Sequence, residues 1–293
     1  MERRRFIVTG ASTGVGLATA HKLSALPETR EVILACRDVE KAQRSTISWS
    51  DEERRRTTIK RLDLCDRKSI NAFAQEVLTK GELHVLINNA GTLEMSQMQV
   101  QGIEKTLLTN HIGPAYLTSL LLPLLLKTAK GEDSDVRIVN VSSRLEKNGS
   151  LNYDDSFLKL RNNGVCGTNF DGWKAYANSK QLNLVYTNAL SQRHPSLKIN
   201  SVTPGMVNTD LSRSFNSFFL YLSWPLRALM LRTPEQGAEA VVHAATAKGV
   251  TSGRFLCDSG AVVVQQRKPT AETEVASLAR TEELIEYWRG RIV

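Results

Sequence analysis

The sequence has too few cysteine and histidine residues, too widely spaced, to suggest a disulfide framework or a metal site. Its four cysteines lie far apart, and its five histidines show no ligand pattern. Cysteine used this sparingly is typical of a protein from a reducing compartment. We therefore predict a functional site without a metal ion.

Long apolar runs are also lacking. The most apolar helical segment, residues 116–129, is too short to span a bilayer and Pro123 interrupts it, so a helix packed within the protein is the simpler interpretation. Residues 1–10 run straight into a strand-like stretch, without a signal-peptide core or an amphipathic presequence. We expect a cytoplasmic protein, and attachment to a membrane surface and a removed organelle presequence stay open as alternatives.

The charge of the chain is unbalanced, but it is not gathered into one tract. There are 38 Lys and Arg against 30 Asp and Glu, a net charge of +8. The basic residues are scattered apart from residues 3–5 and 52–56, which a solvated face explains better than nucleic acid. We expect no nucleic-acid partner, and a modest positive charge suits an anionic cofactor.

Apolar, strand-like runs alternate with helical patterns, for example over residues 14–26 and 66–78. The strand-like runs are apolar on both faces, as buried parallel strands are. This alternation predicts a single α/β domain over residues 1–293, with a doubly wound parallel sheet of about seven strands and helices on both faces. The predicted strands are residues 4–10, 31–37, 57–64, 83–91, 136–143, 197–205 and 253–260.

A glycine-rich turn, "TGASTGVG" at residues 9–16, lies between the first strand and the first helix. Glycine allows a tight turn and a close approach to a pyrophosphate, and the following helix offers N–H groups and the positive end of its dipole. The flanking strand and helix distinguish this pattern from a simple tight turn. The predicted phosphate-binding residues are Gly10, Ser12, Thr13, Gly14, Val15 and Gly16.

The second strand ends in Cys36 and Arg37, where NAD-binding domains commonly place an acidic residue for the ribose diol. A cysteine cannot make that contact, whereas an arginine can bind a 2′-phosphate. Arg37 therefore predicts NADP(H) as the cofactor. An ordinary surface arginine is the alternative, and Asp38 stands beside it.

Two more strand ends fit a cofactor, because open α/β sheets bind ligands at the carboxyl ends of their strands. After the third strand, Asp63 is placed to accept a hydrogen bond from the adenine amine. Small residues after the fourth strand let the cofactor cross the sheet edge. The residues concerned are Asp63, Leu64, Asn89, Ala90 and Gly91, and either group alone is compatible with an ordinary turn.

Four polar residues form a candidate catalytic set: Asn110, Ser143, Tyr176 and Lys180. Tyr176 and Lys180 share one face of a predicted helix. A phenol has an ordinary pKa of about 10, and a nearby ammonium group lowers it. With a serine to hold the substrate oxygen and an asparagine to position a relay water, such a set suits acid–base interconversion of a carbonyl and an alcohol.

The chain resembles the short-chain dehydrogenase/reductase family over nearly its whole length. The motifs "TGASTGVG", "NNAG", "TNHIG", "VNVSS", "YANSK" and "PGMVNTD" occur in the family's order. The resemblance implies that Tyr176 is the general acid/base, that Lys180 lowers its pKa and binds the nicotinamide ribose, and that Ser143 rather than Ser142 holds the substrate oxygen. It also implies an irregular helical turn at Asn110. Residues near the nicotinamide would be Pro204, Gly205, Val207 and Thr209.

Within the family, "ACRDVEKA", "TNHIG" and "FDGWKAYANSK" are most similar to retinol dehydrogenases and light-dependent protochlorophyllide reductase. "NNAG" is the general family form, which that reductase tends to replace, so protochlorophyllide is the less favoured substrate. The segment 144–172 is longer than in much of the family and is either a lid over the site or a surface elaboration. Its Cys166 either faces the substrate or, as we favour, is a bystander.

The segment 211–237 is rich in aromatic and aliphatic residues. We expect it to cover a bulky apolar substrate. Packing on the core is the second interpretation, and peripheral membrane contact through residues 215–231 is the third.

The sequence thus predicts an NADP(H)-dependent oxidoreductase acting on a lipophilic carbonyl or alcohol of retinoid, steroid or other lipid type. Two other functions stay open: a double-bond reductase like protochlorophyllide reductase, and a non-catalytic NADP(H)-binding regulator. A homodimer also stays open.

Overall fold

A computed structural model of the chain describes residues 3–131, 134–151, 161–162, 170–207, 231–257 and 270–290. Its main feature is a seven-stranded sheet in the order β3-β2-β1-β4-β7-β8-β9, in which all the paired strands are parallel. This confirms the predicted fold class. The strands are β1 (Arg4–Thr9), β2 (Thr29–Cys36), β3 (Thr57–Arg61), β4 (Val85–Asn88), β7 (Arg137–Val141), β8 (Lys198–Val202) and β9 (Phe255–Leu256).

The sheet separates two hydrophobic cores, because successive residues of a strand point to opposite faces. Along β1, Ile7 belongs to one core, whereas Phe6 and Val8 belong to the other. The same alternation continues along β4, where Leu86 joins Ile7 and Ile87 joins Val8. Both faces of the central strands are therefore apolar, which explains their nearly unbroken apolar runs.

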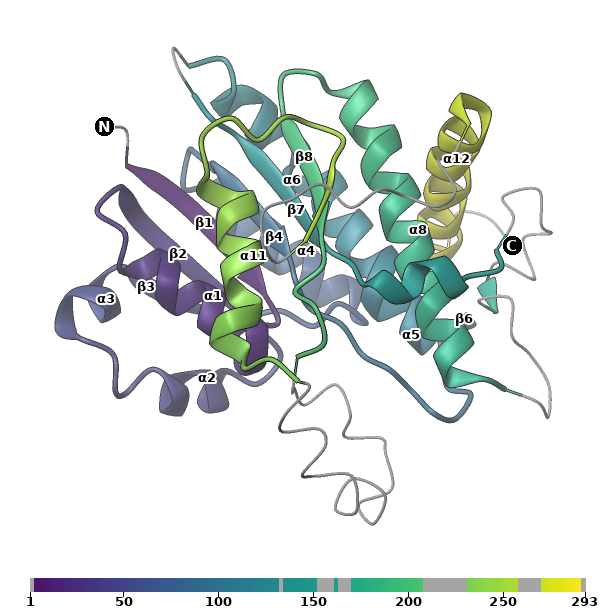
Figure 1. Cartoon of the computed structure of the whole chain (residues 1–293), viewed down its shortest axis with the longest axis horizontal. Helices are drawn as coiled ribbons and strands as arrows, with labels where there is room; N and C mark the ends of the chain where they lie inside the picture. The colour runs from purple at the N-terminus through teal and green to yellow at the C-terminus, as the bar shows by residue number, and fades with distance from the viewer. Residues whose placement is uncertain are drawn as a thin grey trace.

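Helices cover both faces of the sheet. The core of Ile7 includes residues from α4 (Arg67–Leu78), α6 (Gly113–Thr128), α8 (Gly172–Arg193) and α12 (Ala271–Trp288). The opposite core includes residues from α1 (Gly14–Ser24) and α11 (Pro234–Thr246). Figure 1 shows α12, in yellow, alongside α8 and at the opposite end of the molecule from β3 and α3. The shorter elements are α2 (Val39–Ser45), α3 (Asp51–Arg55), β5 (Gln99–Val100), β6 (Ile103–Glu104), α5 (Lys105–Leu107), η1 (Leu108–Ile112) and η2 (Arg144–Asn148).

Two local predictions need correction. Pro123 does not interrupt its helix, because α6 continues through it to Thr128. Pro123 is exposed, so water can satisfy the carbonyl that it leaves without a donor. The third strand ends at Arg61 rather than at residue 64, which leaves Asp63 and Leu64 in the loop beyond it.

Among the described residues, no helix is both long and apolar enough to cross a membrane. The same residues hold no group of three or more potential metal ligands. Within this part of the chain, Cys36, Cys65 and Cys257 form no disulfide bond. Cys166 and most of the segments 144–172 and 211–237 lie outside the described residues, so their predicted roles stay predictions.

Candidate active site

The candidate site lies at the carboxyl ends of β1 and β4, where the strand order reverses. In the sheet, β1 lies between β2 and β4. The chain after β1 continues to β2 on one side, whereas the chain after β4 continues to β7 on the other side. Thr9 links the two strand ends: its carbonyl accepts from Asn89 Nδ2 at 2.8 Å, and its Oγ1 accepts from Ala90 N at 3.0 Å. The predicted residues Asn89 and Ala90 therefore hold the glycine-rich turn in place.

The glycine-rich turn requires glycine at its close contacts. Gly10 has φ +67° and Gly14 has φ +58°, both in the left-handed region. A Cβ atom on Gly10 would lie 2.8 Å from the Ala90 Cα atom, and one on Gly16 would lie 2.5 Å from the Gly10 carbonyl oxygen. The first turn of α1 lies so close to the ends of β1 and β4 that Gly10 and Gly16 have no room for a side chain.

The glycine-rich turn leads directly into the amino end of α1. Thr13 is the N-cap residue, and its side chain makes no capping bond to the helix. The first N–H groups of a helix have no partner within the helix, and they carry the positive end of its dipole. In an eleven-residue helix that follows a buried strand, this is the usual arrangement for binding a phosphate.

The helix α8 supplies the two main catalytic candidates. Asp171 caps its amino end by accepting from Trp173 N at 2.9 Å and from Lys174 N at 3.1 Å. Tyr176 and Lys180 lie one turn apart and are both buried. Lys180 Nζ lies 5.5 Å from the centroid of the Tyr176 ring and donates to the Val141 carbonyl at 2.9 Å. The end of β7 therefore fixes the lysine beside the tyrosine.

Burial sets the proton affinities of these two groups. It raises the pKa of Tyr176 to about 12, and a hydrogen bond with Ser143 acts in the opposite direction. Burial also lowers the pKa of Lys180 to about 8. Burial therefore dominates the pKa of Tyr176 in this structure, and the lowering of that pKa by Lys180, 5.5 Å from the centroid of the ring, stays a prediction.

The two serines that follow β7 have different surroundings. Ser142 is buried, and its hydroxyl donates to the Lys180 carbonyl at 3.1 Å, so it braces α8. Ser143 is half-buried, accepts from Leu145 N at 3.2 Å and shares a hydrogen bond with Tyr176. The structure thus brings Ser143, the predicted member of the pair, to the tyrosine.

Asn110 lies in η1, a π-helical turn, as expected from the irregular turn predicted there. Its Oδ1 accepts from Thr92 N at 2.7 Å, and its Nδ2 donates to the Thr92 carbonyl at 2.9 Å and to Ser179 Oγ at 3.0 Å. The side chain of Asn110 therefore joins the loop after β4 to α8. Its backbone carbonyl accepts from Asn183 Nδ2 at 2.8 Å, and the relay water predicted beside Asn110 stays a prediction.

The residues predicted at the adenosine end lie along one edge. Arg37 is exposed, and it makes no hydrogen bond or ion pair with another described residue. Asp38 is engaged with α2, because its carboxylate accepts from Lys41 N at 2.8 Å. Asp63 Oδ1 accepts from Cys65 N at 2.9 Å, which orients that carboxylate at the strand end. Leu64 is buried against Gly113, where a Cβ atom would lie 2.3 Å from its carbonyl oxygen.

The loop after β8 packs against α1 and α11. Gly205 has φ +80°, and Val207 forms an isolated parallel bridge with Arg232. Val207 Cγ2 and Val15 Cγ2 both approach Gly237 of α11, at 2.6 and 3.2 Å from where its Cβ atom would lie. Pro204 and Val207 thus meet Val15 of α1 around Gly237, Gly205 faces Arg232, and Thr209 lies outside the described residues.

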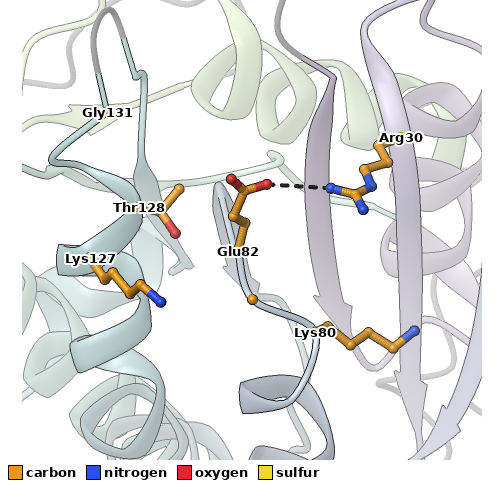
Figure 2. Close-up of a pocket in the computed structure, with 7 residues that line it drawn as sticks. Arg30, Lys80, Glu82, Lys127, Thr128 and Gly131 are labelled. Carbon is orange, nitrogen blue, oxygen red and sulfur yellow. Dashed lines mark hydrogen bonds and ion pairs between the residues drawn. The ribbon is translucent and has the colours of Figure 1, made fainter.

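A depression of about 410 Å³ lies at the opposite, amino end of the sheet (Figure 2). Its residues lie at the start of β2, just before β4, and at or just after the end of α6. The depression is therefore at the other end of the sheet from the glycine-rich turn. Arg30 and Glu82 form an ion pair across it at 3.3 Å. The lining residues are Arg30, Lys80, Gly81, Glu82, Lys127, Thr128 and Gly131.

Comparison with known protein families matches residues 4–154 to the family described as short chain dehydrogenase. The chain belongs to the short-chain dehydrogenase/reductase family. Within the family, it lies in the retinol dehydrogenase-like branch. Retinol dehydrogenase 12 from Bos taurus is 34% identical over 274 residues, which cover 91% of this chain and 81% of that protein. Retinol dehydrogenase 11 from Homo sapiens is 35% identical over 260 residues, which cover 86% and 76% respectively.

Solved structures of other proteins share the architecture of this family member. An uncharacterised protein from Mycobacterium paratuberculosis has 27% identity and a TM-score of 0.74, with 97% of this chain and 94% of that chain covered. The NADPH-bound carbonyl reductase from chicken fatty liver has 24% identity and a TM-score of 0.67, with 90% and 100% covered. These likenesses support the fold and its layered sheet.

The sequence analysis did not identify the polar residues that hold Asn110 in place. Ser179 and Asn183 both lie on the face of α8 that contains Tyr176, and Thr92 receives the Asn110 amide. Helical spacing could have revealed Ser179 and Asn183, three and seven residues after the tyrosine. Thr92 left no such signal, because its contacts are made through its backbone.

Proposed function

We propose that the protein is an NADP(H)-dependent oxidoreductase that interconverts a carbonyl and an alcohol on a lipophilic substrate. The observation that supports this best is the convergence of Ser143, Tyr176 and Lys180 at the strand edge that also holds the glycine-rich turn. A hydroxyl, a phenol and an ammonium group in one buried place are suited to moving a proton to or from a substrate oxygen.

The residues at this edge fit a nicotinamide dinucleotide. The turn at Gly10, Gly14 and Gly16 has no room for side chains, and the α1 amino end suits a pyrophosphate. Gly91 faces the nicotinamide end, since a Cβ atom on it would lie 3.3 Å from Asn110 Oδ1 and 3.7 Å from Lys180 Nζ. We assign the cofactor to Gly10, Ser12, Thr13, Gly14, Val15, Gly16, Arg37, Asp63, Leu64, Asn89, Ala90, Gly91, Tyr176, Lys180, Pro204, Gly205, Val207 and Thr209.

Arg37 favours NADP(H) over NAD(H). It follows β2 and is exposed, and it has no ion pair among the described residues, so its guanidinium is available for a 2′-phosphate. The neighbouring acid does not compete for a ribose diol, because Asp38 caps α2. Arginine binds phosphate through two parallel hydrogen bonds.

The chain's own groups handle the proton. The bound cofactor supplies or accepts the hydride at the carbonyl carbon. In the reducing direction, the Tyr176 hydroxyl donates its proton to the substrate oxygen while the Ser143 hydroxyl donates a hydrogen bond to it. The loss of this proton leaves Tyr176 as a phenolate, and the Lys180 ammonium stabilises its negative charge. The reverse transfers return the proton to Tyr176 during oxidation.

Exposed apolar side chains support a lipophilic substrate. Met95 and Met98 follow β4, Trp173 lies at the start of α8, and Met206 follows β8, all on the side of the sheet where the strands end. Gly172 brings the start of α8 against the loop after β4, since its Cβ atom would lie 2.2 Å from the Glu94 carbonyl oxygen. Together with the retinol dehydrogenases among its relatives, this favours a retinoid-like or other lipid-like substrate.

The test is Tyr176→Phe, assayed with NADPH and retinal among a panel of lipophilic aldehydes and ketones. We expect turnover to fall at least about 100-fold, because the proton donor is lost, while NADPH binding by fluorescence titration stays the same. Tyr287→Phe, at a tyrosine on α12 whose hydroxyl accepts from Arg161 at 2.7 Å, is the matched control. Undiminished turnover in Tyr176→Phe would contradict the assignment.

A further inference from the structure

A buried chain of hydrogen bonds connects α12 to the turn that holds Asn110. His111 Nε2 lies 3.0 Å from Thr281 Oγ1 on α12, and His111 Nδ1 lies 2.9 Å from Asn183 Oδ1 on α8. Asn183 Nδ2 in turn donates to the Asn110 carbonyl at 2.8 Å. His111, Asn183 and Thr281 are all buried, with exposed fractions of 1%, 8% and 1%.

The sequence explains why the Asn110 carbonyl needs this donor. In an α-helix, a carbonyl accepts from the N–H group four residues later. Four residues after Asn110 stands Pro114, which has no N–H group. Asn183 Nδ2, from another helix, donates to this carbonyl.

The partners fix the direction of the bond between His111 and Asn183. Because Asn183 Nδ2 donates to a carbonyl, its Oδ1 must face His111, so His111 Nδ1 carries a proton. The ring is buried, and burial lowers the pKa of His111 to about 4, so the ring is neutral at pH 7 and its Nε2 carries no proton. The Thr281 hydroxyl lies 3.0 Å from Nε2 and donates to the Ser277 carbonyl at 2.7 Å, so its single proton can serve only one of these two acceptors at a time.

We propose that His111 is a positioning residue for the reaction at Tyr176: it holds Asn183, and Asn183, through its bond to the Asn110 carbonyl, fixes the turn that carries the Asn110 side chain. The inference rests on the proposed oxidoreductase function. The Asn110 Oδ1 atom and Lys180 Nζ both approach Gly91, at 3.3 and 3.7 Å from where its Cβ atom would lie. The turn that Asn183 holds is therefore part of the surroundings of the catalytic lysine.

A purely structural histidine would behave differently on substitution. The ring also packs edge-to-face against Tyr186 at 5.5 Å between centroids, so its removal will lower stability in either case. The positioning role depends on one atom, the N–H at Nδ1. Asparagine can place an amide N–H near that atom, whereas glutamine places its amide near Nε2.

The test therefore compares His111→Asn with His111→Gln, using NADPH and retinal. We expect His111→Gln to lose about 10- to 100-fold in kcat with little change in the KM for NADPH, as a displaced catalytic group would. His111→Asn should keep a kcat much closer to that of the wild type, although both variants should unfold at a lower temperature than the wild type. Equal kcat values in the two variants would overturn the proposal.

Thr281→Val keeps the shape of the side chain and removes only the hydroxyl, so it provides a variant that folds readily. It leaves the Nδ1 bond in place, and we expect a smaller loss of kcat than in His111→Gln. A loss as large as in His111→Gln would show that the contact with α12, rather than the bond to Asn183, controls turnover, and would also overturn the proposal.

A measurement without turnover separates this inference from the proposed function. Long-range ¹H–¹⁵N spectra at pH 7 report which ring nitrogen of a histidine carries the proton. The His111 signal is assigned as the one that is absent from His111→Leu, and in the wild-type protein it should show the proton on Nδ1. A proton on Nε2 instead would refute the hydrogen-bond chain. If no carbonyl is reduced by the wild type while Nδ1 is protonated, the proposed function fails and the chain of bonds stands.

Discussion

The two ends of β7 each hold a buried basic side chain, and their surroundings differ. At the amino end, Arg137 is fully buried and paired with Asp135, and it also donates to the carbonyls of Ala244 and Ala247 at 3.0 and 2.9 Å. At the carboxyl end, the hydrogen bond of Lys180 Nζ within the described residues is to the Val141 carbonyl. No carboxylate is paired with Lys180 in that part of the chain.

The difference separates a structural cation from a catalytic one. Burial by itself would raise the pKa of Asp135, but the hydrogen bond and charge of Arg137 lower it overall, as in a stable ion pair. For Lys180, burial lowers the pKa to about 8, because no neighbouring acid compensates for the lost hydration. A buried charge left this way costs stability, and such groups gather at functional sites.

Lys180→Met should produce the largest effect on activity. It keeps the length of the side chain and removes the charge beside Tyr176, so we expect turnover to fall on the order of 1000-fold in an NADPH oxidation assay with retinal. The melting temperature should stay the same or rise, since an unpaired buried charge is removed. A large loss of stability would show that Lys180, like Arg137, has a structural role.

Arg137→Met should do the opposite. It removes the buried cation paired with Asp135, which keeps an ion pair with Lys198 at 3.2 Å, and it removes the donors to two carbonyls. We therefore expect the free energy of unfolding to fall by about 3 kcal/mol. Urea denaturation measures this, and turnover per folded molecule should stay near the wild-type value. Loss of turnover with unchanged stability would contradict the comparison between the two ends of β7.

The same contrast explains what the sequence could predict. The seven strands of the parallel sheet followed from apolar runs, because strands buried on both faces leave a continuous signal. The Tyr176 and Lys180 pair followed from its helical spacing. The shift in the Tyr176 pKa did not, because the balance between burial and charge depends on packing that spacing does not reveal.

Asn110 and Arg137 show the limits more sharply. The family resemblance predicted an irregular turn at Asn110, but the donor to its carbonyl, Asn183, comes from another helix. In the sequence, Arg137 is a single basic residue at the start of an apolar strand. The carbonyls that it donates to belong to Ala244 in α11 and to Ala247 just after that helix. Contacts between elements distant in sequence have no local pattern.

Arg37→Glu should change cofactor preference rather than turnover. A guanidinium bound to a 2′-phosphate contributes about 1.5–3 kcal/mol, so we expect the KM for NADPH to rise roughly 10- to 100-fold while the KM for NADH changes little. Arg44→Glu, at an exposed arginine of α2 whose ion pair with Glu40 spans 3.7 Å, is the charge-matched control. Equal effects on both cofactors would refute the assignment of NADP(H).

The smallest expected effect is the pH dependence of stability that Lys180 imposes. Its pKa falls from the ordinary 10.5 to about 8 on folding, so between these values the unfolded chain holds the proton and the folded chain has released it. Stability therefore rises with pH across this window, because the unfolded state binds more protons. Below pH 8 the folded protein bears the full cost of a buried ammonium group. The melting temperature of Lys180→Met should exceed that of the wild type most at pH 7, and the difference should shrink as the pH rises towards 10. A difference that is constant with pH would show that Lys180 is not desolvated in the folded protein.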